Sequence, residues 1–256
     1  MLSAALLVAF LSLPVAALVL GSLSELGHGL VHPLVLPALE LTLLTTSISL
    51  LAILALGTPL AWILARGSGR WVRLVETLVE LPVVIPPAVA GLALLLAFGR
   101  QGLLSGVLYP AGASLAFSTL SVILAQSFVA APFYVQAAVG AFRALDPELL
   151  LVARTLGAQP VRVFFRIALP LALPGLVAGA ALSWARALGE FGATLMFAGN
   201  LPGRTTTLPL AIYTALESDL SAARALSVIL VLFSFSLLLV MRVSLANRSR
   251  GRGDVR

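Results

Sequence analysis

The sequence has 256 residues, of which 60% are hydrophobic and only 10% charged, and its mean hydropathy is +1.10. Soluble domains carry about 25% charged residues, so this composition predicts an integral membrane protein with one membrane domain over residues 1–256. The long apolar runs described below predict that it is all-α. All 16 basic residues are arginine. A Walker A phosphate loop and lysine Schiff-base chemistry are therefore excluded, and the lack of cysteine excludes disulfides and cysteine-ligated metals.

The first apolar run, residues 2–20, predicts a membrane helix that the protein retains. A cleaved signal peptide is the alternative, but the run has no basic start and no clean small-x-small cleavage site. The next segment carries Glu25, His28 and His32, and two histidines four residues apart could share a metal ion. Because no further ligand is evident and Pro33 follows directly, an interfacial loop is the favoured interpretation.

Five further apolar runs complete a predicted set of six membrane-spanning helices. Each has at least the roughly 17 residues that the shortest membrane helices need. The outer segment 200–224 is also expected to contain an amphipathic helix, from about Leu208 to near Asp219. The five runs are residues 38–65, 74–98, 115–142, 171–198 and 225–241.

The third of the six runs begins with a charged stripe. Arg73, Glu76 and Glu80 lie three and four residues apart, and therefore on one side of a helix. Carboxylates within a membrane are expensive and often functional, so this stripe could be a proton relay. A neutralised cluster at the inner membrane surface is the interpretation that we favour.

Three prolines interrupt this third run. Pro82, Pro86 and Pro87 are expected to break the helix, and Gly91 follows about one turn later. Broken backbone at membrane depth is tolerated where it is buried in protein or lines a cavity. Pro86, Pro87 and Gly91 are therefore candidate elements of a translocation path.

Residues 145–170 form a long polar interruption in the apolar sequence. Asp146 is a good N-cap, the proline after it fits a first helical turn, and Glu148 suits the positive end of the helix dipole. Gly157 is the expected stop of this helix, and Pro160 opens a second short helix. Two short helices joined at a glycine cannot cross a bilayer, so they predict an elbow at the membrane surface that docks another protein.

The fifth run carries two patterns. Small residues recur every four positions and would let another helix approach closely. Arg186 and Glu190 are also four apart, on a different face. They are either an intrahelical ion pair that neutralises itself or, in a sharper hypothesis, a source of positive potential on an anion path. The small residues are Gly175, Gly179, Ser183 and Ala187.

The distribution of arginine predicts the orientation of the chain. Twelve of the 16 arginines lie in segments 66–73 and 142–170 and in the C-terminal tail. Because cytoplasmic loops carry an excess of basic residues, both termini and the elbow are expected in the cytoplasm. The arginines sit between apolar runs, so nucleic acid is not an expected partner.

The elbow resembles the cytoplasmic coupling loop of ABC importer permeases. That family's pattern is Glu-Ala-Ala, three residues, Gly, nine residues and Ile-x-Leu-Pro. This chain matches at Ala153, Gly157 and residues 167–170 but has Leu151 and Val152 in place of the Glu and first Ala. A glutamate one turn earlier could supply the acidic contact. The resemblance implies that ATPase coupling involves Asp146, Glu148, Ala153, Arg154, Gly157, Ala158, Arg162, Ile167, Leu169 and Pro170.

Two further stretches resemble the molybdate and tungstate permeases of that family. Residues 81–102 contain the paired prolines, the glycine one turn later and the run Phe98-Gly99-Arg100. Residues 187–213 contain the turn Pro202-Gly203-Arg204-Thr205. The sulfate and thiosulfate permeases are the nearest relatives of this group and are the alternative. The resemblance extends over most of the chain from about residue 38.

The resemblance implies a type I ABC importer permease of a prokaryotic inner membrane, with a permease core at about 38–242. It would import a tetrahedral oxyanion, and it would assemble with a second copy of itself, two cytoplasmic ATP-binding subunits and an external oxyanion-binding protein. The chain would be no enzyme and would hold no cofactor or metal, because ATP and Mg²⁺ bind to the partner subunits. The expected path residues are Pro86, Pro87, Gly91, Arg186, Glu190 and Thr194, with further hydroxyl donors at Thr205, Thr206 and Thr207.

An ion-coupled secondary transporter is the rival hypothesis from another class. It would use Glu76, Glu80 and Glu190, and it would show inverted repeats of broken helices, which we do not find in the sequence. An intramembrane enzyme is a third option, but no HExxH or GxSxG motif supports it.

Overall fold

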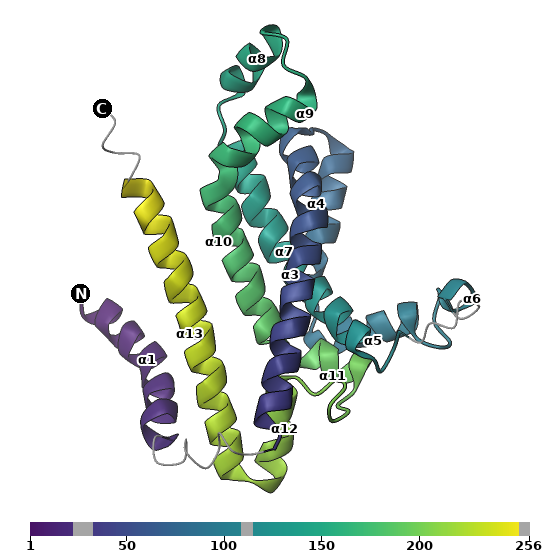
Figure 1. Ribbon diagram of the computed structural model, residues 1–256, viewed down its shortest axis with the longest axis vertical. Helices are drawn as coiled ribbons and strands as arrows, with labels where there is room; N and C mark the ends of the chain where they lie inside the picture. The colour runs from purple at the N-terminus through teal and green to yellow at the C-terminus, as the bar shows by residue number, and fades with distance from the viewer. Residues whose placement is uncertain (23–32, 109–114, 251–256) are drawn as a thin grey trace.

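The computed structural model describes residues 1–22, 33–108 and 115–250, without the side chains of 237–238 and 240–250. Every regular element among these residues is a helix (Figure 1). In chain order the elements are α1 (Leu2–Ser22), α3 (Val35–Arg66), α4 (Arg70–Val84), α5 (Pro87–Phe98), α6 (Ser105–Leu108), α7 (Thr119–Arg143), α8 (Pro147–Thr155), α9 (Pro160–Val163), the π-helical turn η1 (Phe164–Ala168), α10 (Leu169–Leu188), α11 (Gly192–Ala198), α12 (Leu208–Ser218) and α13 (Leu220–Arg250).

Helix α7 is the centre of the main core. It packs against α3 on one side and α10 on the other (Figure 1). A capping box fixes its start, because Ser118 and Ser121 each accept a hydrogen bond from the other's backbone N–H. Tyr134 and Gln126 in its buried face are almost fully enclosed. The elbow and both broken helices described below are attached to this three-helix core.

The small residues of α10 face α7 of the same chain. A Cβ atom built on Gly175 or Gly179 would lie 2.6 or 2.7 Å from the Cβ atom of an α7 alanine. One turn further, Ser183 donates a hydrogen bond to the carbonyl of Ala130 over 2.8 Å. The predicted close approach of another helix is confirmed, and its partner lies within one chain.

Buried hydroxyl groups on α3 tie three other helices to it. Thr42 accepts a hydrogen bond from the backbone N–H of Leu208 at the start of α12, over 2.8 Å. Thr46 accepts one from the Trp184 indole of α10 over 3.0 Å, and Ser49 donates one to a backbone carbonyl of α7. The sequence does not indicate these partners, because a hydroxyl in a helix can equally bond to its own backbone.

Four helices within the described residues are long and apolar enough to cross a membrane: α1, α3, α7 and the continuous helix Pro160–Leu188. A fifth is added if α4 and α5 count as one broken span, since they meet at 117°. The segment Leu220–Ser236 of α13 is apolar but shorter than these. The described part of the chain is therefore all-helical, with several helices that could cross a membrane.

The predicted break in the third span is confirmed and is sharper than a kink. Helix α4 ends at Val84, and α5 starts at Pro87 and turns away from it. Proline has no N–H group and its ring clashes with the preceding turn, so the consecutive Pro86 and Pro87 end one helix and begin the next. The new helix packs on α11 instead of continuing along α4.

Two other predicted elements are corrected. The fifth span does not run unbroken to residue 198, because the helix ends at Leu188 and α11 starts again at Gly192. The helix that begins at Pro160 is not a separate short one, because α9, η1 and α10 are continuous. The wider π-helical turn precedes Pro170, which has no N–H to donate to the turn before it, and so absorbs the proline without a break.

The two ends of the molecule carry different elements. Helices α8 and α9 lie at one end and α12 at the opposite end, while α13 runs beside α10 with α1 against its outer side (Figure 1). The helix predicted from about Leu208 to near Asp219 is confirmed as α12. Glu25, His28 and His32, the alternative metal ligands, lie outside the described residues. Within the described residues no group of three or more His, Cys, Asp or Glu side chains could hold a metal ion.

Candidate functional site

The first helix of the elbow, α8, begins as the sequence predicts. The Asp146 carboxylate accepts a hydrogen bond from the backbone N–H of Glu148 over 2.8 Å. Pro147 occupies the first turn, where its missing N–H is not needed, and Glu148 adds negative charge at the positive end of the helix. Local chemistry therefore sets the direction in which α8 leaves the membrane core.

Gly157 ends α8 in a left-handed turn. Its φ angle is +84°, its N–H donates to the carbonyl of Arg154 over 2.9 Å, and the N–H of Ala158 donates to the carbonyl of Ala153 over 3.1 Å. These two hydrogen bonds form a Schellman motif. A Cβ atom at Gly157 would meet nothing within 4 Å, so the backbone angle and not crowding requires glycine here.

Three aromatic rings anchor the elbow to the membrane core. The Trp62 ring of α3 lies 5.2 Å from the Phe142 ring of α7 and 5.3 Å from the Phe164 ring of η1, between centroids. Leu150 and Val163, on the inner side of the elbow, are buried in the same cluster. Sequence reasoning missed this anchor, because the rings come from three distant segments whose meeting no local pattern reveals.

Six large apolar side chains of the elbow are exposed, and we call this set the elbow face. Leu151 and Leu156 on it are 62% and 82% exposed. The departures from the coupling pattern, at Leu151 and Val152, therefore lie on this face and not in the core. The face consists of Leu149, Leu151, Val152, Leu156, Val161 and Phe165.

The predicted coupling residues divide between exposed positions and the core. The exposed ones include charges of both signs, and the others hold the elbow in place. Asp146, Glu148, Arg154, Gly157, Arg162 and Pro170 are exposed, whereas Ala153, Ala158, Ile167 and Leu169 pack against the core.

The charged stripe of α4 is partly neutralised from another helix. Glu76 forms an ion pair with Arg143 of α7, beside a cavity of about 280 Å³ that Glu80 and Gln136 also line. The partner therefore comes from α7 and not from Arg73 on the same stripe. This arrangement fits a neutralised cluster near the elbow better than a proton relay.

Glu190 organises the break between α10 and α11. Its side chain is only 1% exposed, and one carboxylate oxygen lies 2.7 Å from the guanidinium of Arg186. The other oxygen accepts a hydrogen bond from the backbone N–H of Ala193, over 2.7 Å, in the first turn of α11. The predicted ion pair is thus present, and its acidic member also caps the following helix, a role that the sequence did not indicate.

The candidate path residues meet at the broken helices. A Cβ atom on Gly192 would lie 2.7 Å from the Cβ atom of Pro87, and one on Gly91 would lie 2.7 Å from the carbonyl oxygen of Ala193. Glycine therefore allows α5 and α11 to pack closely. Pro87 and Arg186 line one small cavity of about 80 Å³ beside the α4–α5 break, and Arg186 retains 28% exposure there.

The predicted hydroxyl donors do not face open space. Thr194, Thr205 and Thr207 are at most 1% exposed, and Thr206 is 7% exposed. The hydroxyls of Thr205 and Thr206 are hydrogen-bonded within their own loop, to backbone groups and to Asn200 respectively. In this conformation these threonines shape the loop and the α5–α11 region.

The chain matches the protein family described as "Binding-protein-dependent transport system inner membrane component" over residues 57–250. It is 51% identical over 194 residues to the molybdenum transport system permease protein ModB of Mycobacterium tuberculosis, covering 76% of this chain and 74% of the relative. It is 39% identical over 217 residues to the protein of the same name from Escherichia coli, covering 83% of this chain and 95% of the relative.

Solved structures give the same fold. The chain superposes on a bacterial ABC transporter involved in the import of the acidic polysaccharide alginate with a TM-score of 0.76, covering 96% of this chain and 93% of that chain. The sequence identity in this comparison is 16%. At that level the likeness concerns the arrangement of helices alone.

Proposed function

The chain belongs to the binding-protein-dependent permease family of ABC importers, within the molybdenum permease group, and we propose that it passes molybdate or tungstate across the inner membrane. It is a permease subunit and not itself an enzyme, so the driving reaction takes place in a partner. ATP and Mg²⁺ bind in that partner, and an external binding protein delivers the oxyanion. Sulfate and thiosulfate remain the alternative substrates, which the experiment below includes.

The observation that carries the proposal is the anchored elbow with its exposed apolar face. An apolar patch rimmed by charges, here Asp146, Glu148 and Arg154, is typical of a protein docking site. The aromatic anchor connects this face to α3 and α7 through close ring contacts, and η1 continues directly into α10. Movement of a docked ATPase would therefore reach the core as the movement of one rigid lever and shift it between two conformations.

We place the chain in the membrane with six spans, both termini and the elbow in the cytoplasm. The excess of arginine at the elbow end and in the C-terminal tail supports this orientation. The bent pair α4–α5 counts as the third span and α13 as the sixth. We propose a single permease domain of about 38–242, and the family match over residues 57–250 supports it.

We propose that two copies of the chain assemble with two ATP-binding subunits, one on each elbow. One chain supplies one elbow and one set of broken helices. A translocation path that alternates between two conformations must be enclosed on all sides, so a second copy is needed to form the opposite wall. The small residues of α10 do not form the interface between the two copies, because they pack against α7 of the same chain. We propose that the exposed apolar surfaces of α4 and α5 form it.

We place the oxyanion path beside the α4–α5 break, where Pro86, Pro87 and Gly91 shape the backbone. Arg186 is the cation that lines the cavity there. Its ion pair with Glu190 reduces the positive potential in the cavity. Arg186 therefore attracts an anion only with the part of its charge that Glu190 does not neutralise. Thr194 is buried next to this region, and its hydroxyl has no hydrogen-bond partner.

Uptake into proteoliposomes tests the proposal. The chain is reconstituted with its ATP-binding subunit and binding protein, and uptake of labelled molybdate is measured with internal ATP or with an imposed proton or sodium gradient. Unlabelled tungstate, sulfate and thiosulfate are the competitors.

We expect uptake to require ATP and the binding protein, and to be inhibited by tungstate far more strongly than by sulfate. Uptake driven by an ion gradient without ATP would establish the secondary transporter instead. Inhibition by sulfate at concentrations as low as those of tungstate would assign the chain to sulfate import.

A further inference from the structure

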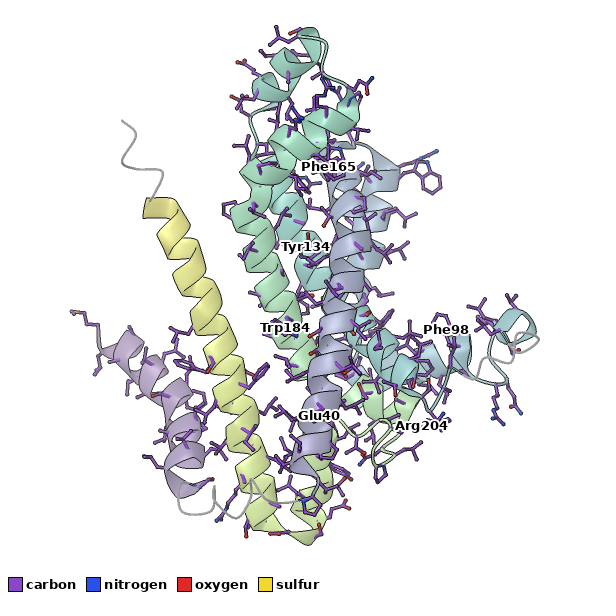
Figure 2. All side chains as sticks on the ribbon, viewed as in Figure 1. Glu40, Phe98, Tyr134, Phe165, Trp184 and Arg204 are labelled. Carbon is purple, nitrogen blue, oxygen red and sulfur yellow. The ribbon has the colours of Figure 1, made fainter. Side chains whose placement is uncertain are left out.

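A second cationic cavity lies beside the half of the molecule that is away from the elbow. It has a volume of about 710 Å³ and is formed where the turn after α5 meets the loop before α12. Arg100 and Gln101 come from the turn, and Arg204 comes from the loop, which Figure 2 shows away from the elbow, next to α11. Two arginines far apart in the sequence therefore share one cavity.

The turn that carries Arg100 is held rigidly against the end of α5. The N–H groups of Leu103 and Leu104 donate to the carbonyls of Leu96 and Ala97 over 2.9 and 3.0 Å. A Cβ atom on Gly102 would lie 2.6 Å from the first of these carbonyl oxygens, so no larger residue fits. These bonds also satisfy two of the carbonyls left free at the end of α5.

The loop that carries Arg204 is equally well fixed. The N–H groups of Arg204 and Thr205 both donate to the carbonyl of Leu201, over 3.0 and 2.9 Å, and Gly203 supplies a φ angle of +71°. The carbonyl of Arg204 accepts a hydrogen bond from the Thr119 hydroxyl over 3.0 Å, which ties the loop to α7. Both arginines therefore extend from preorganised backbone.

Phe117 forms part of the apolar wall and is itself constrained. Its φ angle is +58°, which a bulky residue rarely adopts unless the surroundings impose it. Its N–H donates to the carbonyl of Phe197 over 3.3 Å. A Cβ atom on Gly199, whose φ angle is +70°, would lie 3.1 Å from the Phe117 ring, so a larger residue there would crowd the ring.

The charges of the cavity are all of one sign. No acidic residue lines it, and within the described residues neither Arg100 nor Arg204 takes part in an ion pair. Leu95, Leu96 and Leu201 provide low-dielectric walls, which concentrate the field of the two guanidinium groups inside the cavity. Guanidinium groups also match the oxygens of a tetrahedral anion with paired hydrogen bonds.

We propose that this cavity is a receiving site for a tetrahedral oxyanion dianion, at which Arg100 and Arg204 bind the anion before it reaches the α4–α5 break. The inference rests on the proposed function, because it takes the oxyanion as substrate and this half of the molecule as the outer one. A small anion fits better than an acidic protein surface as the occupant, because apolar walls and a single-sign recess suit a ligand that enters the cavity. An acidic partner surface is an outcome that the test below can identify.

The test compares Arg100→Gln, Arg204→Gln and the double variant with wild type in proteoliposomes that contain the ATP-binding subunit. Arg100→Lys and Arg204→Lys keep the charge but lose the paired hydrogen bonds. Arg70→Gln is the matched control, because it removes an exposed arginine from the opposite end. Uptake of labelled molybdate is measured, and ATPase activity is titrated with molybdate-loaded binding protein.

We expect each glutamine variant to lower uptake about tenfold or more, since a hydrogen-bonded charge contributes about 1.5–3 kcal/mol. The binding-protein concentration for half-maximal ATPase activity should stay within about twofold of wild type, a difference well below the tenfold that 1.4 kcal/mol represents. Uptake by the lysine variants should lie between that of wild type and that of the glutamine variants, and Arg70→Gln should take up molybdate at the wild-type rate.

Two results would overturn the inference. Normal uptake by the double variant would show that the cavity binds no transported anion. A higher half-maximal binding-protein concentration that fully accounts for the lost uptake would assign the arginines to docking of an acidic protein surface. Either result leaves the proposed function standing, whereas failure of wild type to take up any oxyanion would contradict the proposed function itself.

Discussion

At the scale of single residues, Glu190 has the most demanding position in the membrane region. It is buried, it pairs with Arg186 and it accepts a backbone hydrogen bond at the start of α11. Removing one partner of a buried ion pair costs about 3–5 kcal/mol, because the other charge is left uncompensated. Arg186 keeps some exposure to its cavity, so its loss should be tolerated better than the loss of Glu190.

A double-mutant cycle measures this asymmetry. We expect Glu190→Ala to lower the thermal unfolding temperature of the assembled transporter more than Arg186→Ala, and the double variant to recover part of the loss. The unfolding temperature of Glu190→Gln should lie between those of wild type and Glu190→Ala, because the amide oxygen can still accept a hydrogen bond from the Ala193 N–H. Additive effects in the cycle would contradict the structural pair, and full uptake by a well-folded Arg186→Gln variant would exclude Arg186 from the anion path.

Gly157 is the second residue with a specific conformational demand. Replacement by leucine should cost about 1–2 kcal/mol, because a residue with a Cβ atom adopts a positive φ angle poorly. We expect a transporter with Gly157→Leu to hydrolyse ATP but to take up little oxyanion. A transporter with Gly157→Asn should retain most uptake, since asparagine tolerates a positive φ angle. The readout is oxyanion uptake per ATP hydrolysed. A Gly157→Leu transporter that assembles and shows the wild-type ratio would remove the turn from the coupling mechanism.

The residue roles that the sequence could predict are local ones. Asp146 and Gly157 act on backbone groups within a few positions, and cap and turn preferences capture such effects. The capping role of Glu190 was missed because the fifth run looked like one unbroken helix. The bonds of the threonines before α12 within their own loop were not predictable, because a polar side chain does not reveal its partner.

At the scale of the elements, the contact between α10 and α7 admits no added bulk at Gly179. A Cβ atom there would lie 2.7 Å from the Cβ atom of Ala137. We expect Gly179→Leu to destabilise the subunit by about 1–3 kcal/mol through overpacking. Gly140→Ala on α7 is the matched control, since nothing lies within 4 Å of its added Cβ atom and alanine favours helix by about 1 kcal/mol.

Thermal unfolding of the purified subunit distinguishes the two glycines. Gly179→Leu should unfold at a lower temperature than wild type, and Gly140→Ala at the same or a higher temperature. An unchanged unfolding temperature for Gly179→Leu would mean that α10 and α7 are not held as closely as described.

The elbow offers a matched aromatic pair on adjacent positions. Phe164 belongs to the anchor, whereas Phe165 is 59% exposed on the elbow face. We expect Phe164→Ala to lower the unfolding temperature, because removing a packed aromatic ring costs about 3–5 kcal/mol. Phe165→Ala should leave that temperature unchanged but weaken copurification with the ATP-binding subunit. The reverse pattern would place the docking surface on the other side of the elbow.

Element bounds were predictable where capping chemistry marks them and failed where tertiary contacts decide. The start of α8 and the extent of α12 follow from local residues. The break at Gly189 and Glu190 depends on a buried ion pair and on packing against α5, neither of which has a sequence period. The continuity of α9 through α10 was missed, because a π-helical turn that absorbs a proline has no simple sequence signal.

At the scale of the whole molecule, composition and arginine placement already indicate a multi-pass protein with its elbow on one side. The same data could not reveal that the third span bends through 117°, since prolines predict a break but not its angle. The cavity of Arg100 and Arg204 was equally beyond the sequence, because it arises from two loops about a hundred residues apart. Its existence depends on α5 and α11 packing side by side.

The central claim is that the elbow transmits the action of an ATP-binding subunit to the membrane core. Cross-linking from a single cysteine tests it most directly, because the chain has no cysteine of its own. Leu156→Cys on the elbow face and Gln101→Cys in the half away from the elbow are labelled with a photoreactive maleimide in the purified, reconstituted transporter. The captured subunit is then identified by mass spectrometry, with and without ATP.

We expect Leu156→Cys to capture the ATP-binding subunit in an ATP-dependent yield, and Gln101→Cys never to capture it. Capture of the external binding protein by Leu156→Cys, or of the ATP-binding subunit by Gln101→Cys, would contradict the account.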